Sequence, residues 1–337
     1  MKNVGVSSVL LILDSNLFID KNKKELRTLV DSCVIKRQAF LDFDFPSIEF
    51  WVKNQETYDE WVNAHSEFSS IASSYRLTNK VHVIEGIVED EWNLDTPKIK
   101  LTTAIHLVGK QMEVWLENRR NDGAFIKSIL DEGTVRELDK KRSIAQFDYI
   151  SFGGISELKM NLRDGKNSLG FRNKRFVICD SDAPKKNSPH KEATEVVDLC
   201  KSNKISFHCL ERRSIENYLP IDYLIEKVDT RNKQGLHKVN TLKYIKSNFS
   251  DEQRFHYHFK KGFKNSESCK SGIYTHCIKN TEFYSYIRNG FGEGYADSYN
   301  SANETERDKI RKMMHNEGDP EITRLKRDLE DYIRLPI

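Results

Sequence analysis

Acidic side chains follow three apolar runs in the middle of this 337-residue sequence. They are Glu117 after residues 112–116, Asp180 and Asp182 after residues 175–179, and Glu211 and Glu216 after residues 205–210. A single Asp after a strand is commonly the N-cap of the next helix, so an Asp-x-Asp pair alone is a weak sign of a binding site. Three carboxylate-bearing segments that meet at one place would be a much stronger sign.

Carboxylates that meet in this way need compensation for their repulsion. Two carboxylates 4 Å apart repel by about 4 kcal/mol at an effective dielectric near 20. Protonation, a salt bridge or a metal ion removes that cost, and hard oxygen ligands suit Mg²⁺ or Mn²⁺. Such ions polarise a phosphoryl oxygen and activate an attacking water. The acids therefore predict a magnesium or manganese site that acts on phosphate esters.

The elements that would position these acids alternate along the chain. Strands are expected at residues 112–116, 147–152, 175–179 and 205–210, with helical patterns at 122–130, 155–162 and 191–203 between them. This alternation predicts an α/β fold whose central parallel, Rossmann-like sheet is flanked by helices. Because ligands gather at the carboxyl ends of parallel strands, the acidic segments are expected to meet at one edge of this sheet.

The sequence divides into three ranges around the expected sheet. Residues 109–229 are expected to form the central catalytic domain, residues 1–108 an N-terminal α/β extension, and residues 230–337 a mostly helical, basic and aromatic-rich C-terminal region. In the extension, strands are expected at 9–13 and 81–85 and helices at 24–35 and 58–73. The C-terminal region is expected to end in a charged helix over 304–332.

Charge is unevenly distributed over the chain. The whole sequence has 54 Lys and Arg against 51 Asp and Glu, and a net charge of +3 does not by itself imply a nucleic-acid partner. Residues 231–290, however, have twelve Lys and Arg against four Asp and Glu, a difference of +8, with aromatic residues between them. Basic groups neutralise phosphates and aromatic rings stack on bases, so this region is a candidate nucleic-acid surface. The lysines expected to contact phosphate are Lys185, Lys186, Lys260 and Lys264.

The alternating aromatic and histidine residues of 255–259 also have a purely structural interpretation. Alternate residues of a strand point to opposite faces. The pattern Phe-His-Tyr-His-Phe is therefore equally typical of a strand that buries its aromatic rings and turns its histidines to solvent. The two interpretations do not exclude each other.

Cysteine usage and the N-terminal sequence bear on the compartment. The six cysteines form no Cys-x-x-Cys pair, which argues against a zinc site and is typical of a reduced, intracellular protein. The apolar run 9–13 is too short for a signal sequence or a membrane span. The cytoplasm, without membrane association, is the expected location.

Four motifs together resemble a TOPRIM domain. They are Glu-Asn-Arg-Arg-Asn-Asp-Gly at 117–123, the glycine pair at 153–154, Asp-Ser-Asp at 180–182, and Glu-Arg-Arg-Ser-Ile-Glu-Asn-Tyr-Leu-Pro at 211–220. The nearest branch is that of the OLD-like nucleases and the TOPRIM effectors of bacterial anti-phage systems, which act beside an ABC-type ATPase. The resemblance covers about residues 110–225, and Asn118 stands where many TOPRIM domains have glycine.

The resemblance implies a role for each matching residue. Glu117 would be a metal ligand or general acid/base, Asp180 and Asp182 the metal-binding pair, Glu216 a further ligand, and Lys261 a lysine that stabilises transition-state charge. The resemblance further implies an endonuclease that uses Mg²⁺ or Mn²⁺ to cut DNA or RNA, tRNA included, as the toxic effector of an anti-phage system. An ABC-type ATPase would be its partner, and a homodimer is left open.

Two other functions stay open on the sequence. A TOPRIM domain without catalytic activity could serve as a binding module for an ATPase partner. Alternatively, the run Leu-Leu-Ile-Leu-Asp-Ser-Asn-Leu-Phe-Ile at 10–19 resembles the first strand of PIN-domain ribonucleases, with Asp14 as the first metal ligand. Partner acids for Asp14 are not evident, because Asp42, Asp44 and the acids of 85–90 show no clear βα rhythm.

Overall fold

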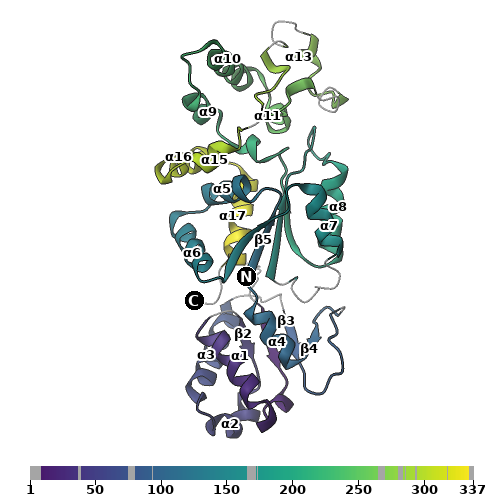
Figure 1. The fold of residues 1–337 in the computed structure, drawn as a ribbon, viewed down its shortest axis with the longest axis vertical. Coiled ribbons are helices and arrows are strands. Elements are labelled where there is room, and N and C mark those ends of the chain that lie inside the picture. The colour runs from purple at the N-terminus through teal and green to yellow at the C-terminus, as the bar shows by residue number, and fades with distance from the viewer. Residues whose placement is uncertain are drawn as a thin grey trace.

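The computed structural model describes residues 9–36, 39–74, 80–92, 94–164, 172, 174–264, 270–279, 284, 286–292, 294–316 and 318–333. Within these ranges the chain forms two four-stranded parallel sheets flanked by helices. Figure 1 shows the N-terminal sheet at one end of an elongated molecule, the second sheet in the middle and a group of helices at the other end. The expected α/β class with a parallel sheet is confirmed.

The central sheet has the strand order β6-β5-β7-β8, and each neighbouring pair is parallel. Its strands are β5 (Met112–Leu116), β6 (Phe147–Ser151), β7 (Arg175–Cys179) and β8 (Ser206–Cys209). Strands β5 and β7 are adjacent in this order, although β6 lies between them in the sequence. The segments that follow them, with Glu117 and Asp180, are therefore neighbours at the carboxyl edge of the sheet.

Side chains of the central strands alternate between two cores, as the two-residue period of a strand requires. Phe176 and Ile178 of β7 join the larger core, whereas Val177 and Cys179 join the smaller one. Helices α7 (Ile155–Asp164) and α8 (Lys191–Ser202) cover the smaller core, and α5 (Arg119–Ile129), α6 (Glu132–Ser143) and α17 (Pro320–Ile333) cover the larger one. The sequence does not predict α6, because its polar composition leaves little apolar periodicity.

The N-terminal range forms a parallel α/β unit of its own, with the strand order β2-β1-β3-β4. Its strands are β1 (Leu10–Leu13), β2 (Phe40–Asp42), β3 (Lys80–Val83) and β4 (Lys98–Ile99). Its helices are α1 (Lys23–Val34), α2 (Phe45–Lys53), α3 (Tyr58–Ser74) and α4 (Leu101–Gly109), with short 3-10 turns η1 (Ser15–Leu17) and η2 (Asp20–Asn22). The expectation that this region lacks a βα rhythm is wrong, since strands of two to four residues are too short to show a period.

Helices dominate the C-terminal range. After η4 (Ile215–Tyr218) they are α9 (Ile221–Lys227), α10 (Lys233–Asn248), α11 (Asp251–His256), η5 (Gly262–Lys264), α13 (Thr275–Lys279), α15 (Asp297–Ser301) and α16 (Glu304–Asn316). Residues 255–259 do not form the strand that their alternation favours, because α11 includes the first two of them and the rest pair with no described strand. Tyr257 and Phe259 are buried, but so is His256, whose Nδ1 lies 3.0 Å from the Ala183 carbonyl oxygen. The expectation of outward-facing histidines is thus wrong for His256.

The charged helix expected over 304–332 is divided in two. Helix α16 ends at Asn316 and α17 begins at Pro320. Gly318 between them has a φ of +66°, a conformation that glycine adopts at little cost. The break allows α17 to turn back along the central sheet.

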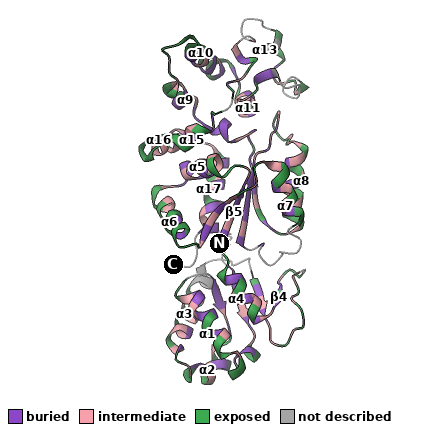
Figure 2. Ribbon diagram, in the orientation of Figure 1, coloured by how far each residue is buried: buried purple, intermediate pink, exposed green. Residues whose placement is uncertain are grey.

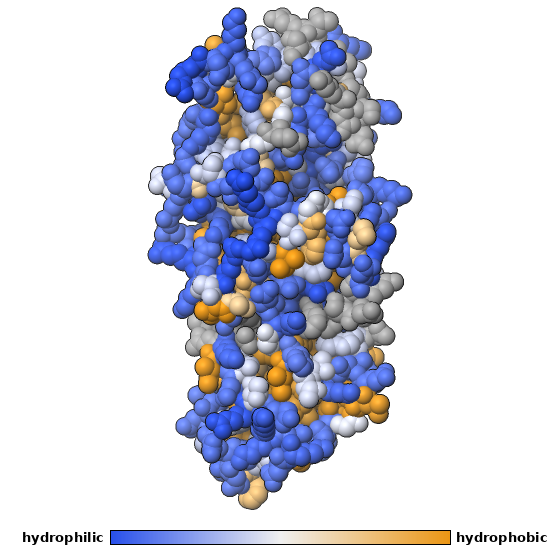
Figure 3. All heavy atoms as spheres, viewed as in Figure 1, coloured by the Kyte–Doolittle hydropathy of each residue, from blue (hydrophilic) through white to orange (hydrophobic). Residues whose placement is uncertain are grey.

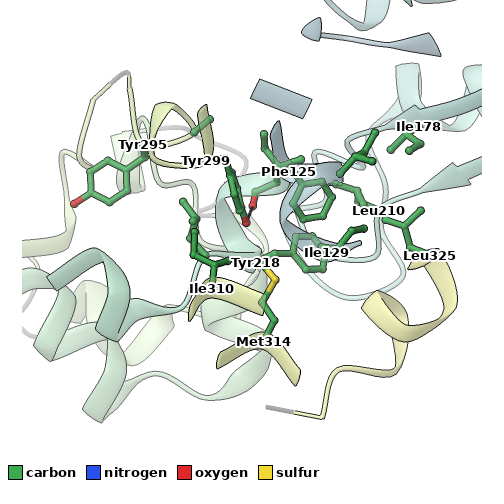
Figure 4. Packing of buried hydrophobic residues seen from close by; sticks show 14 of the residues in the cluster. Phe125, Ile129, Ile178, Leu210, Tyr218, Tyr295, Tyr299, Ile310, Met314 and Leu325 are labelled. Carbon is green, nitrogen blue, oxygen red and sulfur yellow. Dashed lines mark hydrogen bonds between the residues drawn. The ribbon is translucent and has the colours of Figure 1, made fainter. Parts of the chain in front are cut away.

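Helix α17 completes the larger core of the central sheet. The Tyr332 hydroxyl donates to the Glu113 carbonyl oxygen of β5 at 3.1 Å. Figure 4 shows Leu325 of α17 close to Leu210, within a cluster that also contains Ile310 and Met314 of α16. The core therefore extends across the domain boundary expected at residue 229.

Burial follows this arrangement. Buried residues lie along the strands and on the inner faces of the helices (Figure 2). The face drawn in Figure 3 is mostly hydrophilic, with scattered apolar patches. Among the helices of the described ranges, none has both the length and the apolar composition needed to cross a bilayer.

Candidate active site

Glu117 stands directly after β5 and is tied to both neighbouring strands. Its Oε1 accepts a hydrogen bond from the Asp180 N–H at 3.0 Å. Its carbonyl oxygen accepts from the Ser151 hydroxyl and the Gly153 N–H, both at 3.1 Å. Burial is the main cause that raises the pKa of Glu117 to about 8, and the negative charge of Asp122 adds to it. The end of β5 is thereby fixed between the ends of β6 and β7.

Asp122 brings a further carboxylate from the first turn of α5. Its Oδ2 accepts from the Asn118 N–H at 2.8 Å. The Asn118 side chain in turn accepts from the N–H groups of Arg120 and Asn121, at 3.0 and 3.2 Å, and so caps the helix. Burial raises the pKa of Asp122 to about 7, with a contribution from the negative charge of Glu216. Asn118 therefore has a capping role that glycine, without a side chain, could not fill.

Asp180 follows β7 and is surrounded by the other acids. Its Oδ1 accepts from the Ile215 N–H at 3.2 Å. Burial raises the pKa of Asp180 well above its usual value, and the charges of Glu117 and Asp122 raise it further. Three neighbouring carboxyl groups thus have raised pKa values, which means that positive charge placed among them would be strongly stabilised.

Glu216 reaches the same place from η4, beyond the end of β8. It is buried, and its Oε1 lies 3.4 Å from the Lys260 ammonium nitrogen. The charge of Lys260 also acts to lower the pKa values of Glu117 and Asp122, against the larger effect of burial. The tertiary structure thus brings Lys260, rather than Lys261, to the acids.

These residues line one cavity of about 460 Å³ at the carboxyl edge of the central sheet. Its charged lining residues are Glu117, Arg119, Arg120, Asp122, Asp180, Glu216 and Lys260, and the others are Asn118, Asn121, Ser151, Gly153, Gly154, Ile215 and Ala296. The Asn121 Oδ1 atom is buried and has no hydrogen-bond partner among the described residues. The cavity thus combines acids from three segment ends with cations and an unsatisfied oxygen.

Asp182 lies near this cavity without lining it. Its φ is +47°, and its N–H donates to the Arg213 carbonyl oxygen at 2.9 Å. Burial raises the pKa of Asp182, whereas the positive charge of Arg213 opposes the shift. Asp180 and Asp182 are thus placed differently, although the sequence suggests an equivalent pair.

The other predicted basic residues lie elsewhere. Lys185, Lys186 and Lys261 are exposed and are not part of the cavity lining. The side chain of Lys264 lies outside the described residues. Glu211, at the end of β8, also lies outside the lining and pairs with Arg324 at 2.6 Å.

Asp122 and Arg120 are lining residues that the sequence prediction does not select. The signal available for Asp122 is its place in the first turn of the helix that follows Glu117, where a helical side chain can return to the strand end. Arg120 has no comparable signal. With the Asn300 amide turned so that its oxygen faces Arg120, the Arg120 Nε and Nη2 atoms donate to this oxygen at 2.9 and 3.0 Å, a contact between residues 180 positions apart in the sequence.

The donor chemistry of the cavity suits a hard divalent cation. Carboxylate and amide oxygens are the ligands that Mg²⁺ and Mn²⁺ prefer, and the raised pKa values favour a cation at this position. Among the described residues, however, no group of three His, Cys, Asp or Glu side chains is already placed to hold a metal ion. Binding would therefore require the carboxylates to draw together around the ion.

The acids of the N-terminal sheet lie at one edge, and two of them have local partners. Asp14 follows β1 and accepts from the Asn16 N–H at 2.9 Å, which caps η1. Glu85, beyond β3, pairs with Lys21 at 2.5 Å, and Asp42 ends β2. Asp14 and Glu85 thus each have a local role that does not involve the other acids, whereas burial raises the pKa of Asp42.

The central cavity is consequently the stronger candidate on geometry. It has buried acids with raised pKa values and a lysine within ion-pair distance of one of them. Comparisons with models of protein families, with curated proteins and with solved structures found no match for this chain.

Proposed function

We propose that the protein is a metal-dependent endonuclease of the TOPRIM type, which hydrolyses phosphodiester bonds of DNA or RNA in the central cavity. The observation that carries the proposal is that Glu117, Asp180 and Glu216 come from three separate segments and line one cavity with Lys260. Burying acids together costs solvation and repulsion free energy, and a parallel sheet does not need them there for its own stability.

The cavity residues divide into two groups in this proposal. Glu117, Asp180 and Glu216 would hold Mg²⁺ or Mn²⁺, which supplies Lewis-acid polarisation of the phosphate and a more acidic water when bound. Lys260 neutralises the negative charge that develops on the phosphate. Arg120, held by Asn300, orients a phosphate oxygen at the mouth of the cavity.

Asp182 and Lys261 have lesser roles in this proposal than the resemblance implies. Asp182 lies outside the lining, and its backbone N–H, which donates to the Arg213 carbonyl oxygen, holds the loop that follows β7 in place. Lys261 is an exposed lysine of the basic surface. Together with Lys185 and Lys186, which are also exposed, Lys261 would attract the nucleic acid.

The biological setting follows from the resemblance alone. A TOPRIM nuclease of this branch would be a cytoplasmic effector of bacterial anti-phage defence, held inactive or released by an ABC-type ATPase partner. Neither the ATPase nor the choice between DNA and RNA is needed for the chemistry of the cavity.

A cleavage assay tests the proposal directly. Purified protein is incubated with plasmid, single-stranded DNA and total tRNA, each with Mg²⁺, Mn²⁺ or EDTA. We expect cleavage of at least one substrate with either metal, its loss in EDTA, and its loss in Glu117→Gln. Glu211→Gln is the matched control, because Glu211 is an acid at the same sheet edge outside the cavity. Absence of cleavage under every condition, with the ATPase partner also added, would favour the inactive binding module.

A further inference from the structure

A second cavity borders the segment 294–298, which also contributes to the lining of the first. It has a volume of about 310 Å³ and is bounded by the end of α9, the first turn of α10 and residues 294–298. Ala296 of this segment lines the acidic cavity, whereas Gly294, Tyr295 and Ser298 line the second one. In Figure 1, α9 and α10 lie beyond α15, at the far end of the molecule from the N-terminal sheet.

The N-terminus of α10 gives this cavity a positive electrostatic character. The helix is 16 residues long, its Asn232 side chain accepts from the Gly235 N–H at 2.7 Å, and no acid stands in its first turn. The first N–H groups of such a helix have no partner within the helix and attract anions. Lys238, one turn further along α10, adds a positive charge to the wall.

Tyr295 is another lining residue of this cavity, and its unsatisfied hydroxyl is the second observation that points to a ligand. Tyr295 is 8% exposed, and its ring packs on Phe259 and Phe291. Its hydroxyl is buried and has no hydrogen-bond partner among the described residues. Figure 4 shows this hydroxyl turned away from Tyr299 and Phe125. A buried hydroxyl without a partner is destabilising, so an acceptor oxygen that enters the cavity would be favoured.

The anionic groups near the cavity are already neutralised. The Asp229 carboxylate accepts from Nε and Nη2 of Arg231, at 2.9 and 2.7 Å. Lys227 forms an ion pair with Glu306, so this pair adds no net charge to the cavity wall. The remaining donors, namely the α10 terminus, Lys238 and Tyr295, match a group with several negatively charged acceptor oxygens.

We propose that this second cavity binds a phosphate group. The two cavities share the segment 294–298, which favours a backbone phosphate of the same nucleic-acid strand whose scissile phosphate occupies the acidic cavity. This choice of source rests on the proposed nuclease function. A small phosphorylated ligand is the other source of the same chemistry. The phosphate assignment itself depends only on the donors of the second cavity.

Binding of single-stranded nucleic acid is measured with the full-length protein in EDTA, where metal-dependent cleavage is suppressed. Fluorescein-labelled single-stranded DNA and RNA oligonucleotides are titrated by anisotropy between 50 and 200 mM NaCl. Lys238→Ala should raise Kd roughly threefold to tenfold and reduce the slope of log K against log salt by about 0.7, as the loss of one phosphate contact predicts. Tyr295→Phe, which keeps the ring packing, should raise Kd by roughly twofold to fivefold. Lys243→Ala, an exposed lysine of the same helix outside the cavity, should leave Kd within twofold.

Inorganic phosphate supplies the second arm, measured as its effect on Tm for the same variants. A loss of phosphate stabilisation in Lys238→Ala and Tyr295→Phe, together with weaker strand binding, identifies the strand as the source. The same loss with unchanged strand binding supports the site and assigns it to a small phosphorylated ligand. If both variants behave like Lys243→Ala in both arms, the proposal is overturned. Failure of the nuclease proposal would give a different result. The wild type would not cleave nucleic acid, whereas phosphate binding that depends on Lys238 would remain.

Discussion

The acids of the central cavity are held in place by backbone N–H groups. Glu117 accepts from Asp180, Asp180 from Ile215, and Asp122 from Asn118. An amide side chain keeps an acceptor oxygen for each of these bonds but removes the negative charge. Replacing a carboxylate by its amide therefore removes the negative charge without removing the hydrogen bond that positions the side chain.

Asp180→Asn and Glu117→Gln should each reduce cleavage at least about 100-fold while leaving the fold intact, because a charged ligand is lost but the backbone contact stays. Without metal, each should raise Tm by roughly 2 °C, since repulsion between buried carboxylates is relieved. Cleavage rates and thermal unfolding in EDTA measure the two effects. Wild-type cleavage by both variants would remove the chemistry from this cavity.

Lys260→Ala should lower turnover at least about tenfold, because it removes the cation closest to Glu216 and to the developing charge. Lys261→Ala, the neighbouring exposed lysine, should change turnover by less than about twofold, with a small effect on substrate affinity. Steady-state kinetics on one substrate compare the two variants. The reverse order would return the catalytic role to Lys261, as the resemblance implies.

At the scale of elements, α17 is part of the central sheet unit although it is distant in sequence. Glu321 near its start is buried, and its Oε1 accepts from the Glu211 N–H and lies 3.0 Å from His208 Nε2. The Tyr332 hydroxyl near its end bonds the β5 backbone. The helix thus runs from the carboxyl end of β8 to the amino end of β5, across the larger core of the central sheet.

Leu329→Ala in α17 should destabilise the protein by about 2–5 kcal/mol, because a fully buried leucine leaves a cavity in the larger core. Leu236→Ala is the matched control: this leucine of α10 is half exposed, and the change should stay within about 0.5 kcal/mol. Urea unfolding followed by circular dichroism measures both. Equal effects of the two changes would mean that α17 contributes little to the central core.

At the scale of the whole molecule, buried titratable groups make stability depend on pH, and the carboxyl groups act in the opposite direction to His258. The pKa of Glu117 is raised to about 8 and that of Asp122 to about 7, so between about pH 4 and 8 the native state binds more protons than the unfolded state. The free energy of unfolding therefore falls as pH rises through this window. His258, whose pKa burial lowers to about 3, acts in the other sense and reduces stability as pH falls below about 6.5.

In EDTA, Tm should consequently fall by roughly 3 °C or more between pH 6.5 and 8.5. Mg²⁺ should oppose this fall, with a stabilisation that grows as pH rises, because the ion competes with protons for the carboxylates. Asp180→Asn should flatten the dependence in EDTA. Thermal unfolding across this pH range, with and without Mg²⁺, checks all three expectations. A metal-free Tm that rises with pH would contradict the arrangement of buried acids.

The two parallel sheets also permit a test of which one carries the activity. Asp14→Asn should leave divalent-dependent cleavage within a few-fold of the wild type, because the Asp14 carboxylate has a local capping role at η1. Asp180→Asn should remove cleavage, whereas Asp182→Asn, outside the lining, should reduce it less. Nuclease assays with circular dichroism as the folding control compare the three variants. An inactive Asp14→Asn beside an active Asp180→Asn would place the nuclease in the N-terminal sheet.

The sequence by itself determined the central α/β unit and the meeting of Glu117 with Asp180. Buried parallel strands of four or five residues are visible as apolar runs, and an acid that follows such a run has to lie at the carboxyl edge of the sheet. Only the tertiary structure decided that Lys260 reaches the acids while Lys261 stays exposed. It also decided that α17 completes the core. The placement of Lys260 and the packing of α17 depend on contacts between segments far apart in the chain, whereas strand and helix patterns depend on neighbouring residues.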